Sequence, residues 1–242
     1  MSRAVLVLRP ERGASETAAR ARALGLAAVT APLFVVAPLA WQAPDPAGFD
    51  AVLLTSANAA RHGGSGLDAF TGLPCFAVGE ATGAAAREAG FRDVRTGAGD
   101  GAEAVATMVE AGMRSAFHPC GRDHLPLDHP RLPIERRTVY AADGVEALPA
   151  AAVEALAAGA LALVHSPRAG ALLAALVDAA GLARADIAIA AISEAAAAAA
   201  GGGWASVAAA PRPRDEALLA IAAKLCQTPR FGAQDESDHG RL

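Results

Sequence analysis

Small polar residues follow several apolar, strand-like runs of the chain, just where a helix would begin. They are Thr55, Ser56 and Asn58 after one run, Gly79 and Thr82 after the next, Gly121 after a third and Ser166 after a fourth. Arginine occupies comparable places at Arg9, Arg122 and Arg168. Backbone N–H groups at helix starts and guanidinium groups both bind carboxylates and phosphates. The pattern therefore predicts a surface that binds an anion.

A plainer interpretation stays open for each of these residues taken alone. Serine and threonine at helix starts commonly cap the helix, and arginines commonly project into solvent. Capping and solvation do not explain why such residues recur after six strand-like runs of one chain. We therefore favour anion binding for the set as a whole.

The sequence contains no strong signature of a catalytic nucleophile or of a nucleotide-binding loop. Residues 165–170 lack the glycine that precedes serine in a G-x-S-x-G turn. The glycines of residues 63–66 have neither the lysine of a P-loop nor G-x-G-x-x-G spacing. Lys224 is the only lysine of the chain and lies in a terminal helical pattern, so Schiff-base chemistry is not expected either.

A stretch after residue 117 gathers side chains that can bind metals, namely His118, Cys120, Asp123, His124, Asp128 and His129. Their spacings match no zinc pattern. Three prolines within residues 119–130 predict a surface loop. We expect no metal site here.

Charge and cysteine content narrow the class of protein further. The 242 residues carry a formal net charge of −4, which argues against a nucleic-acid groove or a membrane-surface binder. The three cysteines are far apart and form no C-x-x-C pair, which favours a reduced, cytoplasmic protein. Residues 24–44 are uncharged, but three prolines interrupt them, so they predict two short extended segments rather than a membrane helix.

The order of elements favours the α/β class. Residues 4–10 are an apolar run, residues 11–26 are helical with a glycine stop at Gly25, and residues 27–33 form a second apolar run. Strands that alternate with helices in this way predict a parallel sheet with crossover helices.

Two stretches about 110 residues apart repeat the same order of elements. Residues 52–60 and 163–171 each combine an apolar run, a serine and a helix start. Residues 76–90 and 190–203 each combine an apolar run, a turn, a glutamate and an alanine-rich helix closed by glycine. The matching serine, glutamate and glycine landmarks predict two copies of one α/β unit.

Two short β-prone segments separate the copies and define the expected domains. If these connectors pair with each other, the first strand–helix–strand joins the second copy. The expected parts are a discontinuous domain of residues 1–34 and 144–230, a second domain of residues 38–138, connector strands at 32–38 and 136–143, and a flexible polar tail at 231–242.

An ordered series of segments over roughly residues 3 to 223 resembles the uroporphyrinogen-III synthase family. The segments are LLTSANAA, FAVGEATGAAAREAGF, FHPCGRDHL, RTVYAAD, LVHSPRAG, and AAISEAAAAAAGGGW followed by PRPRDEALL. The resemblance rests on their combined order, and on connectors that stand where the family has its interdomain strands.

The resemblance implies a fold of two flavodoxin-like parallel-sheet α/β domains joined by a two-stranded β ladder. It implies the substrate hydroxymethylbilane, a linear tetrapyrrole with eight carboxylates, which the family cyclises to uroporphyrinogen III with inversion of ring D and loss of water. The proposed family mechanism passes through an azafulvene and a spiro intermediate without a cofactor. We expect a cytoplasmic monomer that receives its substrate from hydroxymethylbilane synthase and contacts neither nucleic acid nor membrane.

The resemblance also assigns roles to residues. Tyr140 matches the family tyrosine that is thought to help the hydroxyl leave, although an ordinary strand tyrosine would look the same. Matches to the substrate-binding motifs of the family are Thr55, Ser56, Asn58 and Ser166 at strand ends, and Gly79 and Thr82 in its G-x-x-T pattern.

The second copy departs from the family pattern at three positions. Ser193 replaces a glycine, Ala196 replaces a threonine, and Arg214 replaces a small hydroxyl residue, where it could bind a substrate acetate or propionate. These departures keep a second function open: a non-catalytic two-lobed sensor or binding module for another anionic small molecule.

Overall fold

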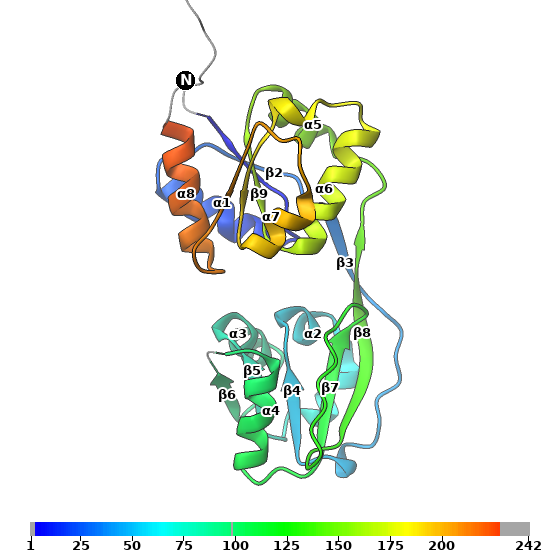
Figure 1. The fold of residues 1–242 in the computed structure, drawn as a ribbon. Helices are drawn as coiled ribbons and strands as arrows, with labels where there is room; N and C mark the ends of the chain where they lie inside the picture. The colour runs from blue at the N-terminus through cyan, green and yellow to red at the C-terminus, as the bar shows by residue number, and fades with distance from the viewer. Residues whose placement is uncertain (1–2, 98, 228–242) are drawn as a thin grey trace, which may run out of the picture. The chain divides into compact units, whose positions relative to one another are not determined.

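The computed structural model describes residues 3–97 and 99–227. The chain forms two compact units. Unit 1 contains the residues up to Phe34 and those from Gly144 onward, and unit 2 contains Val35–Asp143. Each unit has one β-sheet with helices packed against it (Figure 1). The predicted tail at 231–242 lies outside the described residues.

Unit 1 has a five-stranded, fully parallel sheet in the order β11-β10-β9-β1-β2. Its strands are β1 (Val5–Val7), β2 (Ala28–Thr30), β9 (Leu161–Val164), β10 (Ala188–Ala191) and β11 (Ser206–Ala209). Its helices are α1 (Gly13–Ala23), α5 (Ala150–Ala157), α6 (Pro167–Ala179), α7 (Glu194–Ala200) and α8 (Asp215–Gln227), with a 3-10 turn at Arg184–Asp186. Numbered along the unit, the strand order is 2-1-3-4-5, as in flavodoxin.

Unit 2 has a six-stranded sheet in the order β3-β8-β7-β4-β5-β6. Its strands are β3 (Phe34–Pro38), β4 (Ala51–Leu54), β5 (Cys75–Val78), β6 (Val94–Gly97), β7 (Ala116–Gly121) and β8 (Ile134–Gly144). Its helices are α2 (Ala57–His62), α3 (Glu80–Glu88) and α4 (Gly101–Glu110), with 3-10 turns at Pro46–Gly48 and Gly64–Phe70. The five strands from β4 to β8 are joined by parallel pairing.

The two predicted connector segments pair with each other as β3 and β8. The Leu39 N–H donates to the Val139 carbonyl at 2.9 Å, and the Val145 N–H donates to the Leu33 carbonyl at 3.0 Å. Residue numbers rise on one strand as they fall on the other, so this pairing is antiparallel. The α/β class with parallel sheets and a connecting ladder is thus confirmed.

The repeat seen in the sequence is confirmed by the sheet topology. Strands β4, β5 and β6 of unit 2 occupy the same sheet positions as β9, β10 and β11 of unit 1. The next two sheet positions are filled by β7 and β8 in unit 2, but by β1 and β2 in unit 1, and β3 is an additional edge strand of unit 2. The two units therefore share one architecture and differ by a circular permutation of the chain.

Small side chains dominate the core of unit 1. Buried β1, β9 and β10 residues pack against Ala14, Ala18 and Ala21 of α1 and against Leu218 and Leu219 of α8. Alanine and glycine let backbones approach closely, since a Cβ on Gly170 of α6 would lie 2.6 Å from the Ala196 carbonyl oxygen of α7. The alanine-rich composition is therefore used in close packing between helices.

The few aromatic residues of the chain gather mainly in the core of unit 2. Phe70 and Phe117 stack with ring centroids 4.4 Å apart, and Trp41 and Phe49 lie within 6 Å of Phe117. This cluster packs between the sheet and helices α2 and α3, while Met108 and Val105 of α4 cover the opposite face. Together they bury both faces of β4, β5 and β7.

The predicted surface loop at 119–130 is wrong for its first residues. Pro119 and Cys120 belong to β7, which is buried along its length. Pairing of β7 with β4 is recorded at Ala116 and Phe117, whereas pairing with β8 continues to Gly121. Pro119 lies beyond the recorded ladder with β4, so its missing N–H is tolerated there.

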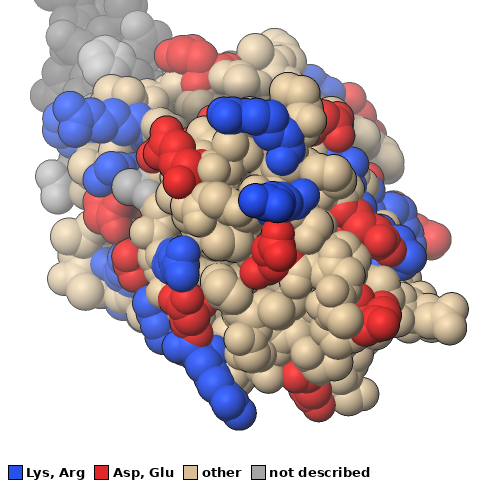
Figure 2. Space-filling model, turned by 90° about the horizontal axis from the view of Figure 1, so that it is seen from below, with Lys and Arg blue, Asp and Glu red and all other residues tan. Residues whose placement is uncertain are grey.

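No helix among residues 3–97 and 99–227 is long and apolar enough to cross a membrane. On the face drawn in Figure 2, basic and acidic side chains lie beside one another rather than in one patch of a single sign.

Candidate functional site

Each sheet has a switch point, which is a pair of neighbouring strands from which the chain connections run in opposite directions along the sheet. It falls between β9 and β1 in unit 1, and between β4 and β7 in unit 2. Ligands of open α/β sheets bind beyond the carboxyl ends of the strands at such points. In unit 2, Thr55 and Ser56 follow β4 while Gly121 ends β7; in unit 1, Arg9 follows β1 while Ser166 follows β9.

Tyr140 of β8 lies over the Gly121 backbone in unit 2. The two residues are paired in the parallel register, next to an irregularity between Cys120 and Gly121. A Cβ on Gly121 would lie 2.7 Å from Tyr140 Cζ and 2.8 Å from its hydroxyl oxygen. Gly121 therefore provides the space that the phenol occupies.

The hydroxyl of Ser56 links the start of α2 to Tyr140. Ser56 Oγ accepts the Asn58 N–H at 3.2 Å and caps the helix. Burial raises the pKa of Tyr140, and a hydrogen bond with Ser56 offsets part of that rise. Ser56 Oγ accepts from Asn58 through one lone pair and keeps its own proton, which it can donate to the phenol oxygen. Tyr140 thus keeps its proton at neutral pH.

Thr55 contacts a histidine that is completely buried. Thr55 Oγ1 lies 3.1 Å from His118 Nε2, and His118 is 0% exposed. Burial lowers the pKa of His118 to about 4, and the charges of Arg136 and His124 act in the same direction. The imidazole is therefore neutral at physiological pH.

Gly79 is the N-cap residue that precedes α3, and its backbone, at φ 77° and ψ 156°, is one that other residues avoid. Thr82, the last residue of its G-x-x-T pattern, is only 5% exposed. Ser193 at the matching place in unit 1 has an ordinary extended φ of −160°, and its Oγ accepts the Ala196 N–H at 3.3 Å. The departure at Ser193 thus exchanges an unusual glycine turn for a side-chain helix cap.

Arg122 directly follows the carboxyl end of β7, and its side chain is exposed. Its backbone N–H donates to the Tyr140 carbonyl at 2.9 Å. Its Nη1 lies 2.6 Å from Asp143 Oδ1, with the two side chains 51% and 62% exposed. Such an exposed pair contributes little to stability and can be exchanged for another anion.

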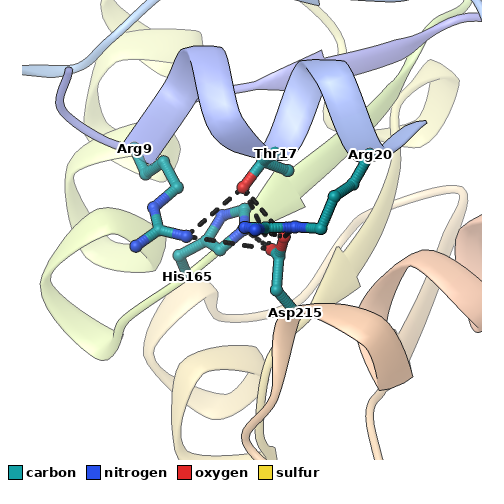
Figure 3. A network of polar contacts seen from close by, with 5 residues as sticks. All are labelled: Arg9, Thr17, Arg20, His165 and Asp215. Atoms are coloured by element: carbon teal, nitrogen blue, oxygen red, sulfur yellow. Dashed lines mark hydrogen bonds and ion pairs between the residues drawn. The ribbon is translucent and has the colours of Figure 1, made fainter. Parts of the chain in front are cut away.

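The switch point of unit 1 holds a polar network centred on Asp215, the first residue of α8 (Figure 3). Thr17 Oγ1 lies 3.1 and 3.0 Å from the two Asp215 carboxylate oxygens. Arg20 Nε donates to Oδ2 at 2.8 Å, and His165 Nε2 lies 2.9 Å from Oδ1. Arg9 Nη1 completes the group at 3.8 Å from Oδ1 and 3.3 Å from Thr17 Oγ1.

This network keeps a carboxylate charged in a protected place. Asp215 and His165 side chains are 9% and 6% exposed. Burial by itself raises the pKa of Asp215, but hydrogen bonds and charge from His165 and Arg20 outweigh it and lower the pKa to about 2. The network ties α1, the end of β9 and the start of α8 together. Arg9, which the sequence predicts to contact a ligand, thus forms an ion pair with Asp215 through one of its guanidinium nitrogens.

The other predicted residues of unit 1 have separate positions. Ser166 caps α6 by accepting the Ala169 N–H at 3.1 Å. The Arg168 guanidinium lies 4.8 Å from the centroid of the Phe34 ring. Arg214 is exposed, and its carbonyl accepts the first helical bonds of α8 from Ala217 and Leu218. The capping interpretation therefore holds for Ser56 and Ser166, each of which still has a proton to donate.

Sequence reasoning missed His165 and Asp215 as partners, and it considered His118 only for metal binding. His165 stands directly after β9, at the place that Thr55 holds after β4, and this correspondence was the available signal. Within residues 3–97 and 99–227, no group of three or more His, Cys, Asp or Glu side chains could hold a metal ion.

Comparison with known proteins gives a consistent result. A family model described as uroporphyrinogen-III synthase HemD matches residues 15–220. The solved structure of uroporphyrinogen-III synthetase from Helicobacter pylori is 15% identical, with a TM-score of 0.61 over 92% of this chain and 99% of that chain. A mutant uroporphyrinogen III synthase from the extremely thermophilic bacterium Thermus thermophilus is 16% identical, with a TM-score of 0.50 over 93% and 100%. No curated protein sequence gives a significant match.

Proposed function

The chain belongs to the uroporphyrinogen-III synthase family, and we propose on that basis that it cyclises hydroxymethylbilane to uroporphyrinogen III. It is thus a lyase-type enzyme of tetrapyrrole synthesis. The finer assignment is a hydro-lyase: the linear tetrapyrrole loses water while its last ring is inverted. The matched residues 15–220 include parts of both units, which supports assignment of the whole chain rather than of one unit.

The observation that carries the proposal is the phenol of Tyr140 above Gly121 at the switch point of unit 2. Its raised pKa keeps the phenol protonated, and Ser56 is available to bind its oxygen. A phenol in that state can donate a hydrogen bond or proton to the hydroxyl that leaves. The proposed catalytic residue is therefore Tyr140.

Substrate carboxylates would bind along the strand ends of both units. In unit 2, the proposed contacts are Thr55, Ser56, Asn58, Gly79, Thr82, Gly121 and Arg122; in unit 1, they are Arg9, Ser166, Arg168 and Arg214. Among the exposed members, Arg214 and Arg122 can meet acetate or propionate groups as a fork of N–H donors. Thr82 is buried, so it would act by supporting the Gly79 turn.

We further propose a cytoplasmic monomer that takes its substrate from hydroxymethylbilane synthase and needs neither cofactor nor metal. The side chains at the two strand-end edges are suited to holding a reactive polycarboxylate in one conformation. Such positioning can supply much of the acceleration when the substrate carries its own leaving group and nucleophile.

The deciding experiment measures which isomer forms. Hydroxymethylbilane generated by its synthase is incubated with the protein, and the products are oxidised and separated by chromatography. We expect type III product in excess over the type I isomer that forms spontaneously. A folded protein that yields type I alone would exclude the proposed function, and tight binding of an unrelated anion would then favour a sensor.

Replacing Tyr140 by phenylalanine tests the role of the phenol. The ring keeps its place over Gly121, while the hydroxyl that can donate to the leaving group is lost. We expect the variant to fold and its kcat to fall about tenfold, as for a lost hydrogen bond to a charged group. Circular dichroism checks folding, and Phe91→Leu, in the core of unit 2, is a control for a general loss of stability with the phenol intact. An unchanged kcat would remove Tyr140 from the mechanism.

A further inference from the structure

His118 is a buried histidine that no step of the proposed reaction uses. It lies on β7, beside the strand β4 that Thr55 follows, at 0% exposure. Its Nε2 lies 3.1 Å from Thr55 Oγ1. Its Nδ1 is shielded from solvent and has no hydrogen-bond partner among residues 3–97 and 99–227. A neutral imidazole carries one N–H and one lone pair, so the position of its single proton matters.

The unpaired Nδ1 indicates where the proton lies. A buried N–H without an acceptor is rarer in proteins than a buried acceptor without a donor. The proton is therefore best placed on Nε2, where Thr55 Oγ1 accepts it. Thr55 Oγ1 then accepts a hydrogen bond from His118 through one lone pair. Its own O–H is free to turn toward the strand-end surface.

We propose that His118 is a positioning residue that fixes Thr55 as a hydrogen-bond donor toward a substrate carboxylate. The proposal rests on the function proposed above, since it needs a carboxylate ligand beside Thr55. If the imidazole instead accepted from Thr55, the hydroxyl would offer that ligand only its lone pairs, which repel an anion. The burial of His118, which lowers its pKa to about 4, keeps it neutral and so preserves this arrangement at physiological pH.

The same arrangement occurs once more on this edge of unit 2. Ser56 Oγ accepts the Asn58 N–H, and its own proton can be donated to the Tyr140 oxygen. The phenol, like the Thr55 hydroxyl, then keeps its proton for a ligand. The Thr55 and Tyr140 hydroxyls are in this way set to donate, which favours anionic groups over ligands that carry N–H donors.

The first test is spectroscopic and needs no substrate. Nitrogen-15 spectra of the histidine side chains show which ring nitrogen carries the proton in the full-length protein. We expect the His118 signal to show a protonated Nε2 and a bare Nδ1. A proton on Nδ1 overturns the inference, whatever reaction the protein catalyses.

The second test is kinetic, with hydroxymethylbilane as substrate. His118→Leu should raise KM about fivefold with kcat within about twofold of the parent, as for a hydrogen bond lost from binding. His118→Gln should stay near the parent KM, because its amide N–H can replace Nε2–H, and His129→Gln in the neighbouring loop serves as a control. In a Thr55→Val background, His118→Leu should have no further effect on KM.

The outcomes separate this inference from the proposed function. A full effect of His118→Leu in the Thr55→Val background, or no rescue by His118→Gln in a folded variant, overturns the positioning role. If the parent protein makes only type I uroporphyrinogen, the proposed function fails instead, and the imidazole spectrum alone then decides the orientation of the Thr55 hydroxyl.

Discussion

Replacing Asp215 by asparagine is expected to lower the free energy of unfolding of unit 1 by about 2 kcal/mol at pH 7. The figure follows from the fall of the Asp215 pKa from 3.8 to about 2, at 1.36 kcal/mol for each pH unit. Asparagine keeps the shape of the side chain but leaves Arg20 and the buried His165 without a charged partner. Urea denaturation of the two proteins measures the difference.

The stabilisation that Asp215 provides is expected to depend on pH. The folded-state pKa of Asp215 is lowered, so its stabilisation is complete above the ordinary pKa near 4 and is lost as pH falls through about 2. The difference between parent and variant should therefore be constant from about pH 5 to 8 and shrink below about pH 4. Glu216→Gln, an exposed neighbour in the same helical turn, is the matched control. Equal losses in both variants would contradict the importance of the network.

Replacing Gly121 by alanine is expected to lower kcat by about a hundredfold, more than the loss of the Tyr140 hydroxyl itself. The new Cβ would lie 2.7 Å from Tyr140 Cζ, so the ring must move away from the strand end. A misplacement of about an ångström at a reacting group can cost that much in rate. Turnover to the type III isomer measures the effect.

A double-mutant comparison shows whether the ring is the cause. In a Tyr140→Ala background, Gly121→Ala should have little further effect on kcat, because the clashing ring is gone. Gly72→Ala is the control, since a Cβ there meets no atom within 4 Å. A Gly121→Ala variant with the parent kcat would show that catalysis does not depend on the position of the Tyr140 phenol over Gly121.

The fold could be predicted well from sequence because its signals are local. Apolar runs such as residues 161–164 and glycine stops such as Gly25 mark strands and helix ends by their own chemistry. The repeat of serine, glutamate and glycine landmarks then indicated the correspondence between the copies. What no local signal gave was the order of strands in unit 2, because the permutation lies in long-range pairing.

The candidate site could be predicted only in part, for a related reason. Strand-end residues such as Thr55 and Ser166 are visible because they follow apolar runs. The contact between Thr17 and Asp215 joins residues 198 positions apart, and nothing near either residue indicates the other. Likewise, the sequence around His118 predicts a loop, whereas its strand is buried through pairing with β8. The sequence shows the residue types, but it does not show which residues contact one another in the folded protein.

The circular permutation also determines the order in which the two units can be completed during synthesis on the ribosome. Unit 2 is one continuous segment, and all its strands exist once β8 has been made. The first strand of unit 1 is made before any of them, yet its neighbour β9 follows the whole of unit 2. Val5, Leu6 and Val7 are fully buried in the finished sheet, and β9, which pairs with them on one side, is available only after unit 2 has been made. Strand β1, which is synthesised before unit 2, therefore belongs to the unit that is completed after it.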